Sequence, residues 1–182
     1  MVQREVTTWF LEMRSTSALQ PVAVSNPAAV MLRAEIPSPE LSRYLYTAVG
    51  GPWFWLGRLD WDYAQWMAYL DRPAMETWLL SVRGTPAGYV ELEAQPEDAI
   101  EIALFGLLPS FVGQGLGRYF LSAAVARAWA RGAQRVWLHT CSLDGPYALA
   151  NYQARGFVVY DQRTQLLELP DVSPGPWPGA GV

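Results

Sequence analysis

The stretch that decides the fold runs from residue 107 to residue 117 and reads LLPSFVGQGLG. It begins at the end of IEIALFGLL, residues 100–108, whose aliphatic and β-branched residues predict a strand. An alanine-rich pattern over residues 116–131, ended by Gly132, predicts the longest helix of the chain. A strand that turns through glycines into a helix gathers backbone N–H groups and the positive end of the helix dipole. We therefore expect this turn to bind an anion.

Three glycines of this turn, Gly113, Gly115 and Gly117, let the backbone approach a phosphate closely, because a Cβ would block that approach. Ordinary tight turns also contain such glycines. A dinucleotide-binding fold would place the turn after its first strand, with an acidic residue about 20 residues further on. Here three predicted strands of the sheet precede the turn, and residue 137, at the distance where the acidic residue would stand, is Trp. A P-loop would require Gly-Lys-Ser/Thr, where this chain has Gly117-Arg118-Tyr119. Both nucleotide folds fit the sequence poorly.

The segments before the glycine turn predict a meander of strands behind two helices. Residues 7–13 form a predicted strand, and a Pro- and Ser-punctuated stretch follows to Pro39. Helical spacing covers residues 40–49 and 60–70, with Asp60 or Asp62 as a cap for the second helix. Residues 77–83 and 87–94 read as a hairpin that pairs with residues 100–108 in an antiparallel meander.

The segments after the long helix alternate between strand and helix. Residues 135–141 predict a strand, residues 146–155 a helix stopped at Gly156, and residues 157–160 and 164–169 the closing strands. The class is therefore α+β, or mixed α/β, with a single sheet. Residues 170–182 hold four prolines and three glycines, which predicts an irregular or disordered tail.

Composition excludes several classes of protein. With 182 residues and 51% hydrophobic content, the chain is expected to form a single domain over residues 1–182. A net charge of -4 lacks the basic footprint of a nucleic-acid-binding protein. One cysteine, Cys141, allows no internal disulfide and indicates a reducing cytoplasm. No apolar run reaches the about 18 residues of a membrane span, and the charged N-terminal segment does not read as a signal peptide.

Two segments carry a resemblance to a known family. Residues 112–117, VGQGLG, resemble the Arg/Gln-x-x-Gly-x-Gly/Ala pattern with which the GNAT acetyltransferase superfamily binds the pyrophosphate of CoA. Residues 148–157, ALANYQARGF, look like the Ala-x-x-x-Tyr-x-x-x-Gly-Phe segment of the same family. Val112 departs from the first pattern, because it offers a backbone N–H but no side-chain donor, and Gln114 or Arg118 is expected to substitute in part. The family's asparagine near residue 145 is replaced by Gly145, with Asp144 beside it.

The resemblance implies a mostly antiparallel sheet, flanked by helices and splayed between residues 100–108 and 135–141. The pantetheine arm of acetyl-CoA would lie in the split, next to a bulge near Gly106, and would bond to exposed backbone near Leu107 and Leu108. Residues 77–169 would form the acetyl-CoA-binding core, and residues 1–75 a variable region on the acceptor side. The expected cofactor-binding residues are Leu107, Leu108, Val112, Gly113, Gln114, Gly115, Leu116, Gly117 and Arg118.

The resemblance also implies direct transfer of the acetyl group to an amine. An alkylamine with a pKa of about 10.4 must lose a proton before it can attack the thioester. Glu101 stands at the spacing of the general-base glutamate of histone-type family members, and Tyr152 matches the tyrosine that protonates the leaving thiolate or binds the sulfur. Glu91 and Glu93 share one strand face and could instead bind a substrate cation, and His139 is a substrate or water contact. Strand carboxylates are also common as solvated charges, so these alternatives stay open.

The remaining features set the limits of this interpretation. Four tryptophans, Trp53, Trp55, Trp61 and Trp66, gather in residues 50–66 and read as an acceptor pocket, as core packing or as the interface of a homodimer. No His, Cys and carboxylate spacing predicts a metal site, and His139 with Cys141 lacks the third group of a nucleophilic triad. A non-catalytic acyl-CoA-binding module and a nucleotide- or S-adenosylmethionine-binding enzyme are the alternatives to an N-acetyltransferase.

Overall fold

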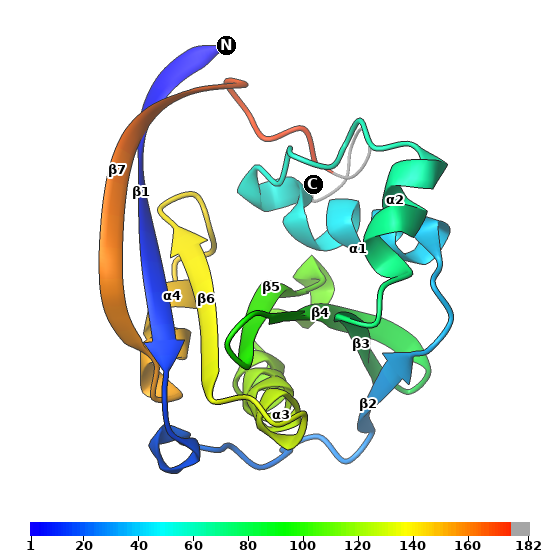
Figure 1. The fold of residues 1–182 in the computed structure, drawn as a ribbon. Coiled ribbons are helices and arrows are strands. Elements are labelled where there is room, and N and C mark those ends of the chain that lie inside the picture. The colour runs from blue at the N-terminus through cyan, green and yellow to red at the C-terminus, as the bar shows by residue number, and fades with distance from the viewer. Residues whose placement is uncertain (176–182) are drawn as a thin grey trace.

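A computed structural model describes residues 1–175, and its strands form a single seven-stranded sheet in the order β2-β3-β4-β5-β6-β1-β7 (Figure 1). The strands are β1 (Val2–Met13), β2 (Ala29–Ala34), β3 (Met75–Val82), β4 (Thr85–Gln95), β5 (Ala99–Leu107), β6 (Arg135–Cys141) and β7 (Val158–Leu169). The helices are α1 (Pro39–Gly50), α2 (Tyr63–Leu70), α3 (Leu116–Ala130) and α4 (Ala148–Ala154). The mixed α+β class predicted from the sequence is confirmed.

The sheet divides between β5 and β6. Strands β2 to β5 pair antiparallel in sequence order, and β6, β1 and β7 pair antiparallel on the other side. Among the described residues, strands of the two groups pair only where Ala99–Glu101 of β5 runs parallel to Arg135–Trp137 of β6. Beyond Glu101 the two strands separate, as Figure 1 shows for the green and yellow strands. The predicted splay is therefore present, and it begins at the residue predicted as the general base.

Helices cover the β2–β5 group on both faces. Helix α3 buries Phe120, Ala124 and Val125 against Val90 and Ile102 of the sheet in the largest apolar cluster. On the opposite face, α1 packs its buried Leu45 and Val49 against Tyr89. Since successive residues of a strand point to opposite faces, β4 contributes to both clusters and is buried on both sides.

Several elements differ from the sequence-based prediction. The stretch between residue 14 and Pro39, predicted only as punctuated chain, contains β2, which pairs along β3 from Ala29 to Ala34. Residues 158–169 form one strand instead of two, because they pair with β1 from Val2 to Glu12, with one register shift that leaves Tyr160 without a partner. The bulge of β5 lies at Ala103, where the register with Glu91 and Leu92 shifts, and not near Gly106. In each case a long-range ladder decides the outcome, and local propensity does not.

The stretch from residue 170 to residue 175 contains no helix or strand, as the sequence predicts. It is nevertheless held against β1 and the end of α1 by hydrogen bonds. The carbonyl of Asp171 accepts a bond from Arg4, and the Ser173 hydroxyl bonds to Gly51 and accepts the N–H of Phe54 at 3.3 Å. These contacts carry the chain from the β1–β7 edge to the end of α1 (Figure 1). The rest of the predicted irregular tail, residues 176–182, lies outside the described residues. Among residues 1–175, no helix combines the length and the apolar character needed to cross a membrane.

Candidate active site

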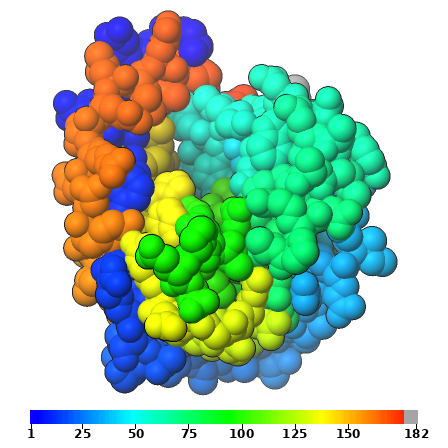
Figure 2. Space-filling view, in the orientation of Figure 1, coloured from blue at the N-terminus to red at the C-terminus, as the bar shows by residue number. Residues whose placement is uncertain are grey.

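A cavity of about 970 Å³ occupies the split of the sheet. Its walls come from β5, the glycine turn, β6, α4 and the chain after α1. Figure 2 shows the surface hollowed between the yellow strand β6 and the cyan-to-teal segment of α1 and α2. One continuous cavity therefore joins the segment predicted to bind CoA to the region predicted to bind an acceptor.

The glycine turn meets the cavity at the start of α3. Gly113 and Gly115 have φ values of 81° and 77°, a left-handed conformation that favours glycine. Gly115 is the N-cap of α3 and makes no side-chain cap bond, so the first N–H groups of the helix have no partner within the helix. Gly117 also lines the cavity. The turn thus combines left-handed glycines with an uncapped helix start at the wall of the cavity.

The other predicted residues of the turn divide into three groups. Val112 and Arg118 line the cavity. The amide of Gln114 donates to the Ser110 carbonyl at 2.8 Å, so it holds the turn together in place of an open side-chain donor. Leu116 is buried in the core, where it supports the helix start from behind.

The backbone of β5 is open toward the split at Leu107. Leu108 donates its N–H to the Ala87 carbonyl at 2.9 Å, so its donor is already used by the sheet. Because alternate residues of a strand direct their backbone groups to opposite sides, Leu107 directs its N–H and C=O away from β4. Of the two residues predicted to pair with pantetheine, Leu107 offers the free edge.

Tyr152 lines the same cavity from α4. Its ring is packed against Phe105 and Phe157, which fixes its orientation. Burial raises the pKa of the Tyr152 hydroxyl, and the charge of Asp144 raises it further. The group therefore stays protonated at neutral pH and can act as a hydrogen-bond donor.

Glu101 and His139 form a pair where the sheet splits. His139 Nδ1 lies 3.5 Å from Glu101 Oε1, and His139, not Glu101, lines the cavity. The second oxygen of Glu101 accepts a bond from Gln95 at 2.5 Å, and Gln95 accepts one from Trp137 at 3.1 Å. Glu101 of β5 is thus held by Gln95 of β4 and His139 of β6, and His139 is the member of the pair that faces the cavity.

Glu91 and Glu93 point to the same face of β4, as predicted, but both are paired within the protein. Glu91 is fully buried and accepts bonds from Arg58 at 2.9 Å and from Tyr69 at 2.8 Å. Burial raises the pKa of Glu91, and Arg58 offsets part of that rise. Glu93 accepts a bond from Arg72 at 2.8 Å. Neither carboxylate lines the cavity, so the structure gives both a role in the fold.

The tryptophan cluster is divided between the cavity and the core. Trp53 and Trp55 line the cavity. Trp61 and Trp66 instead surround the guanidinium of Arg58, whose carbon lies 4.9 Å and 5.8 Å from their ring centroids. The aromatic box that the sequence offers to a substrate cation is therefore filled by an arginine of the chain itself.

Sequence reasoning missed four residues of the cavity wall that carry polar groups: Asp144 as a side chain in contact with the site, Tyr147, Asn151 and Arg155. Asp144 accepts bonds from the Thr140 hydroxyl at 2.6 Å and the Cys141 N–H at 2.9 Å. Asn151 and Arg155 belong to the helical spacing 148, 151, 152, 155, which places them on one face with Tyr152. That spacing was visible in the sequence and is the signal that could have identified them.

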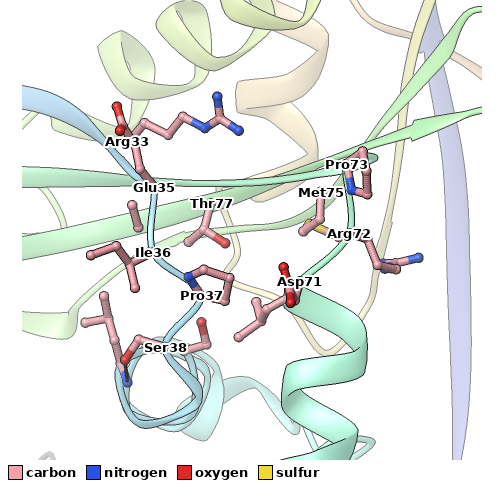
Figure 3. Close-up of a pocket in the computed structure, with 14 residues that line it drawn as sticks. Arg33, Glu35, Ile36, Pro37, Ser38, Asp71, Arg72, Pro73, Met75 and Thr77 are labelled. Atoms are coloured by element: carbon pink, nitrogen blue, oxygen red, sulfur yellow. Dashed lines mark hydrogen bonds between the residues drawn. The ribbon is translucent and has the colours of Figure 1, made fainter.

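A second, smaller cavity of about 290 Å³ lies between β2, the start of α1 and the end of α2 (Figure 3). Its two arginines are already paired with carboxylates outside the cavity, Arg33 with Glu76 and Arg72 with Glu93. Within residues 1–175, no cluster of three or more His, Cys, Asp or Glu side chains has the arrangement of a metal site. The large cavity is therefore the candidate active site.

Comparison with solved structures shows the same fold in several acetyltransferases. A GCN5-related N-acetyltransferase from Kribbella flavida matches with a TM-score of 0.64 and 19% identity over 95% of this chain and 60% of that one. A GCN5-related N-acetyltransferase from Sphaerobacter thermophilus has a TM-score of 0.66 and 16% identity over 90% and 51% of the two chains. A Bacillus subtilis acetyltransferase in complex with CoA has a TM-score of 0.57 and 20% identity over 73% and 78%.

This chain thus spans about 60% of the Kribbella protein and about half of the Sphaerobacter protein. No curated protein matches it in sequence. The Acetyltransferase (GNAT) family matches residues 40–157, which include α1, the glycine turn and α4. The chain belongs to the GNAT acetyltransferase family.

Proposed function

We propose that this protein transfers an acetyl group from acetyl-CoA to a primary amine while both substrates are bound. The observation that carries the proposal is the single cavity that reaches from the glycine turn at Gly115 to Trp53 and Trp55. A donor and an acceptor can therefore meet inside it without an intermediate held on the enzyme. Cys141 lines the cavity, but burial raises the pKa of its thiol, which disfavours a nucleophilic thiolate.

The donor would lie along the residues between Leu107 and Arg118. The N–H groups at the start of α3 suit the pyrophosphate, because they combine free donors with the positive end of the helix dipole. The pantetheine arm would pair with the open backbone edge of Leu107 in the manner of an added strand. Bound in this way, the thioester would lie beside Tyr152 and His139.

Proton transfer would use Glu101 and Tyr152 on opposite sides of the reacting carbon. The acceptor ammonium loses a proton to Glu101 by way of His139, the amine nitrogen attacks the carbonyl carbon, and the carbon–sulfur bond breaks. Tyr152 then donates its proton to the departing sulfur and regains one from the nitrogen, which must lose its second proton to become the amide, so the products are the amide and the free thiol of CoA. The raised pKa of Tyr152 keeps this donor in place throughout the neutral range.

The acceptor end would be built by the region before residue 75, which contributes Val49, Trp53 and Trp55 to the cavity. The core from residue 77 to residue 169 would bind the donor. Aromatic walls suit an amine carried on an apolar or aromatic body, since a cation gains from the faces of such rings. We also propose a cytoplasmic setting, because a single cysteine fits a reducing compartment.

The first test is thermal unfolding with and without acetyl-CoA, followed by release of free CoA thiol with a panel of amines. Acetyl-CoA at 100 times its dissociation constant should stabilise the parent by about 2.7 kcal/mol. Gly115→Glu places a negative charge at the proposed pyrophosphate site and should abolish the stabilisation. Gly57→Glu is the matched control, because a Cβ at Gly57 meets no atom within 4 Å and the residue does not line the cavity.

A non-catalytic acyl-CoA-binding module is the second candidate, and Val112 is the observation that favours it. Where the family pattern has Arg or Gln, Val112 supplies no side-chain donor to the phosphates. Stabilisation by acetyl-CoA without thiol release for any amine would support this candidate. The absence of stabilisation in the parent would contradict both candidates.

A further inference from the structure

Helix α4 presents an unpaired positive charge to the cavity. Arg155 follows the last residue of the helix, exposes only 9% of its surface and lines the cavity wall. Its Nε donates to the Ala154 carbonyl at 3.1 Å, but its buried Nη1 has no hydrogen-bond partner among residues 1–175. A buried charged donor without a partner is costly, so the site is incomplete as it stands.

The other well-buried arginines of the described chain are neutralised. Arg58 pairs with Glu91 at 2.9 Å and Arg131 with Glu76 at 3.5 Å, with side chains 15% and 14% exposed. Arg155 has no ion pair with a described carboxylate. The neighbouring charge that acts on its guanidinium is a second cation, Arg118. Burial lowers the pKa of Arg155, and the positive charge of Arg118 lowers it further. Two guanidinium groups that no carboxylate of residues 1–175 neutralises therefore stand near each other on the wall of one cavity.

The position of this pair identifies the chemistry it would bind. Arg118 lies in the first turn of α3, directly after the glycine turn, and both arginines line the cavity with Gly113, Gly115 and Gly117. The free N–H groups, the helix dipole and two guanidinium groups all favour an anion. A guanidinium matches phosphate geometry with two parallel N–H···O bonds, which explains why an arginine suits this position.

We infer that Arg155, acting with Arg118, binds a phosphate group of the CoA donor. The inference rests on the proposed function. It assigns the side-chain contact to a CoA phosphate, which Val112 cannot make, to a residue at the end of α4. The same chemistry is offered by two parts of CoA, the diphosphate bridge and the 3′-phosphate, and the experiment distinguishes them.

The experiment is calorimetric titration of CoA and of dephospho-CoA, which lacks the 3′-phosphate, into the parent, Arg155→Gln and Arg43→Gln. Arg43 is exposed on α1 and does not line the cavity, so its variant removes the same charge elsewhere. Loss of a charge-assisted hydrogen bond predicts about a tenfold or greater fall in the CoA affinity of Arg155→Gln, and no such fall for Arg43→Gln.

Dephospho-CoA identifies the phosphate. A loss confined to CoA assigns Arg155 to the 3′-phosphate, and an equal loss with both ligands assigns it to the diphosphate; both results support the inference. Unchanged affinity of Arg155→Gln for both ligands, with a parent that binds them, would overturn the inference and leave the proposed function standing. A parent that binds neither ligand would overturn both.

Unfolding without ligand separates binding from a structural role. Because Arg155→Gln removes an unpaired buried charge, the midpoint of its thermal unfolding should equal or exceed that of the parent. Arg155→Lys keeps the charge but not the paired N–H groups, and its affinity should fall between those of Arg155→Gln and the parent. A lowered midpoint in both variants with unchanged CoA affinity would show that Arg155 is structural.

Discussion

At the scale of single residues, the contact between Glu101 and His139 changes how the base should be tested. Only His139 lines the cavity, and Glu101 lies 3.5 Å behind it. If the two act as one relay, Glu101→Gln and His139→Gln should each lower kcat by about 10²-fold, and the double variant should lose little more. Steady-state kinetics with one responsive amine measures this. Losses that multiply in the double variant would show that the two residues act independently.

Gly156, the glycine of the second family segment, has a structural explanation. It has a φ of 100°, and a Cβ there would lie 2.0 Å from the Ala18 carbonyl oxygen. Gly156→Ala should therefore lower the free energy of unfolding by about 3 kcal/mol, measured with urea.

Gly84→Ala is the matched control for Gly156→Ala. Gly84 has a φ of 82° but open space around a Cβ, so it should lose only about 1 kcal/mol from backbone strain. Equal losses in the two variants would show that the contact with Ala18 has no energetic role.

Local sequence patterns predict the roles of some site residues and not of others. The glycines and Tyr152 could be predicted, because short-range spacing places them at a helix start and on a helix face. The pairing of Glu91 with Arg58 could not be predicted from the sequence, because the partners are 33 residues apart and belong to different elements. The same limit explains why the sequence could not divide the four tryptophans between an acceptor pocket and the core, although Trp53 and Trp55 line the cavity and Trp61 and Trp66 do not.

At the scale of elements, the start of α2 provides a direct test of capping. Asp62 accepts the N–H of Gln65 at 2.8 Å, and the Gln65 side chain accepts the N–H of Asp62 at 2.9 Å. Asp62→Ala should lower the free energy of unfolding by about 1 kcal/mol. Asp60→Ala, two residues earlier and outside this box, should change it by less than about 0.5 kcal/mol in the same urea titration. Similar losses in both would contradict the assignment of the cap.

Elements with a strong local signal were predicted well, and elements that depend on a partner strand were not. Helices α1 to α4 and the meander from β3 to β5 follow from apolar spacing and turn residues. Strand β2 and the full length of β7 are edge strands that exist because β3 and β1 offer them a ladder. The position of the bulge at Ala103 likewise depends on the register with β4, which no local pattern specifies.

At the scale of the whole molecule, Glu76 on β3 ties the sheet edge to α3. It lies 3.5 Å from Arg33 of β2, and Arg127 and Arg131 on the α3 side lie 3.2 Å and 3.5 Å away. Burial alone would raise the pKa of Glu76, but the bonds from Arg127 and Trp78, with the charges of Arg131 and Arg33, lower it below the usual value. The ionised form is therefore favoured in the folded state.

This shift has a defined direction with pH. A depressed carboxyl pKa stabilises the fold above the unfolded value of about 4.3, and the stabilisation disappears as the pH falls through the folded value. Glu76→Gln should therefore be less stable than the parent by about 2 kcal/mol at neutral pH, with the difference shrinking below about pH 4. Urea unfolding across this range measures it, with exposed Glu168→Gln as control. A difference that is constant with pH would contradict the ionic role.

The short contact between β5 and β6 has a mechanical consequence for the molecule. Three residue pairs join two leaves, β2–β5 and β6-β1-β7, and the leaves separate above them. At Leu107 the backbone of β5 has no partner strand on the side of the split among residues 1–175. A pantetheine arm bound along this edge would hydrogen-bond to β5 as an added strand. The two groups of strands would then open together when acetyl-CoA is bound and independently when it is not. Amide hydrogen exchange at the edge of β5 would report this coupling as slower exchange in the loaded protein.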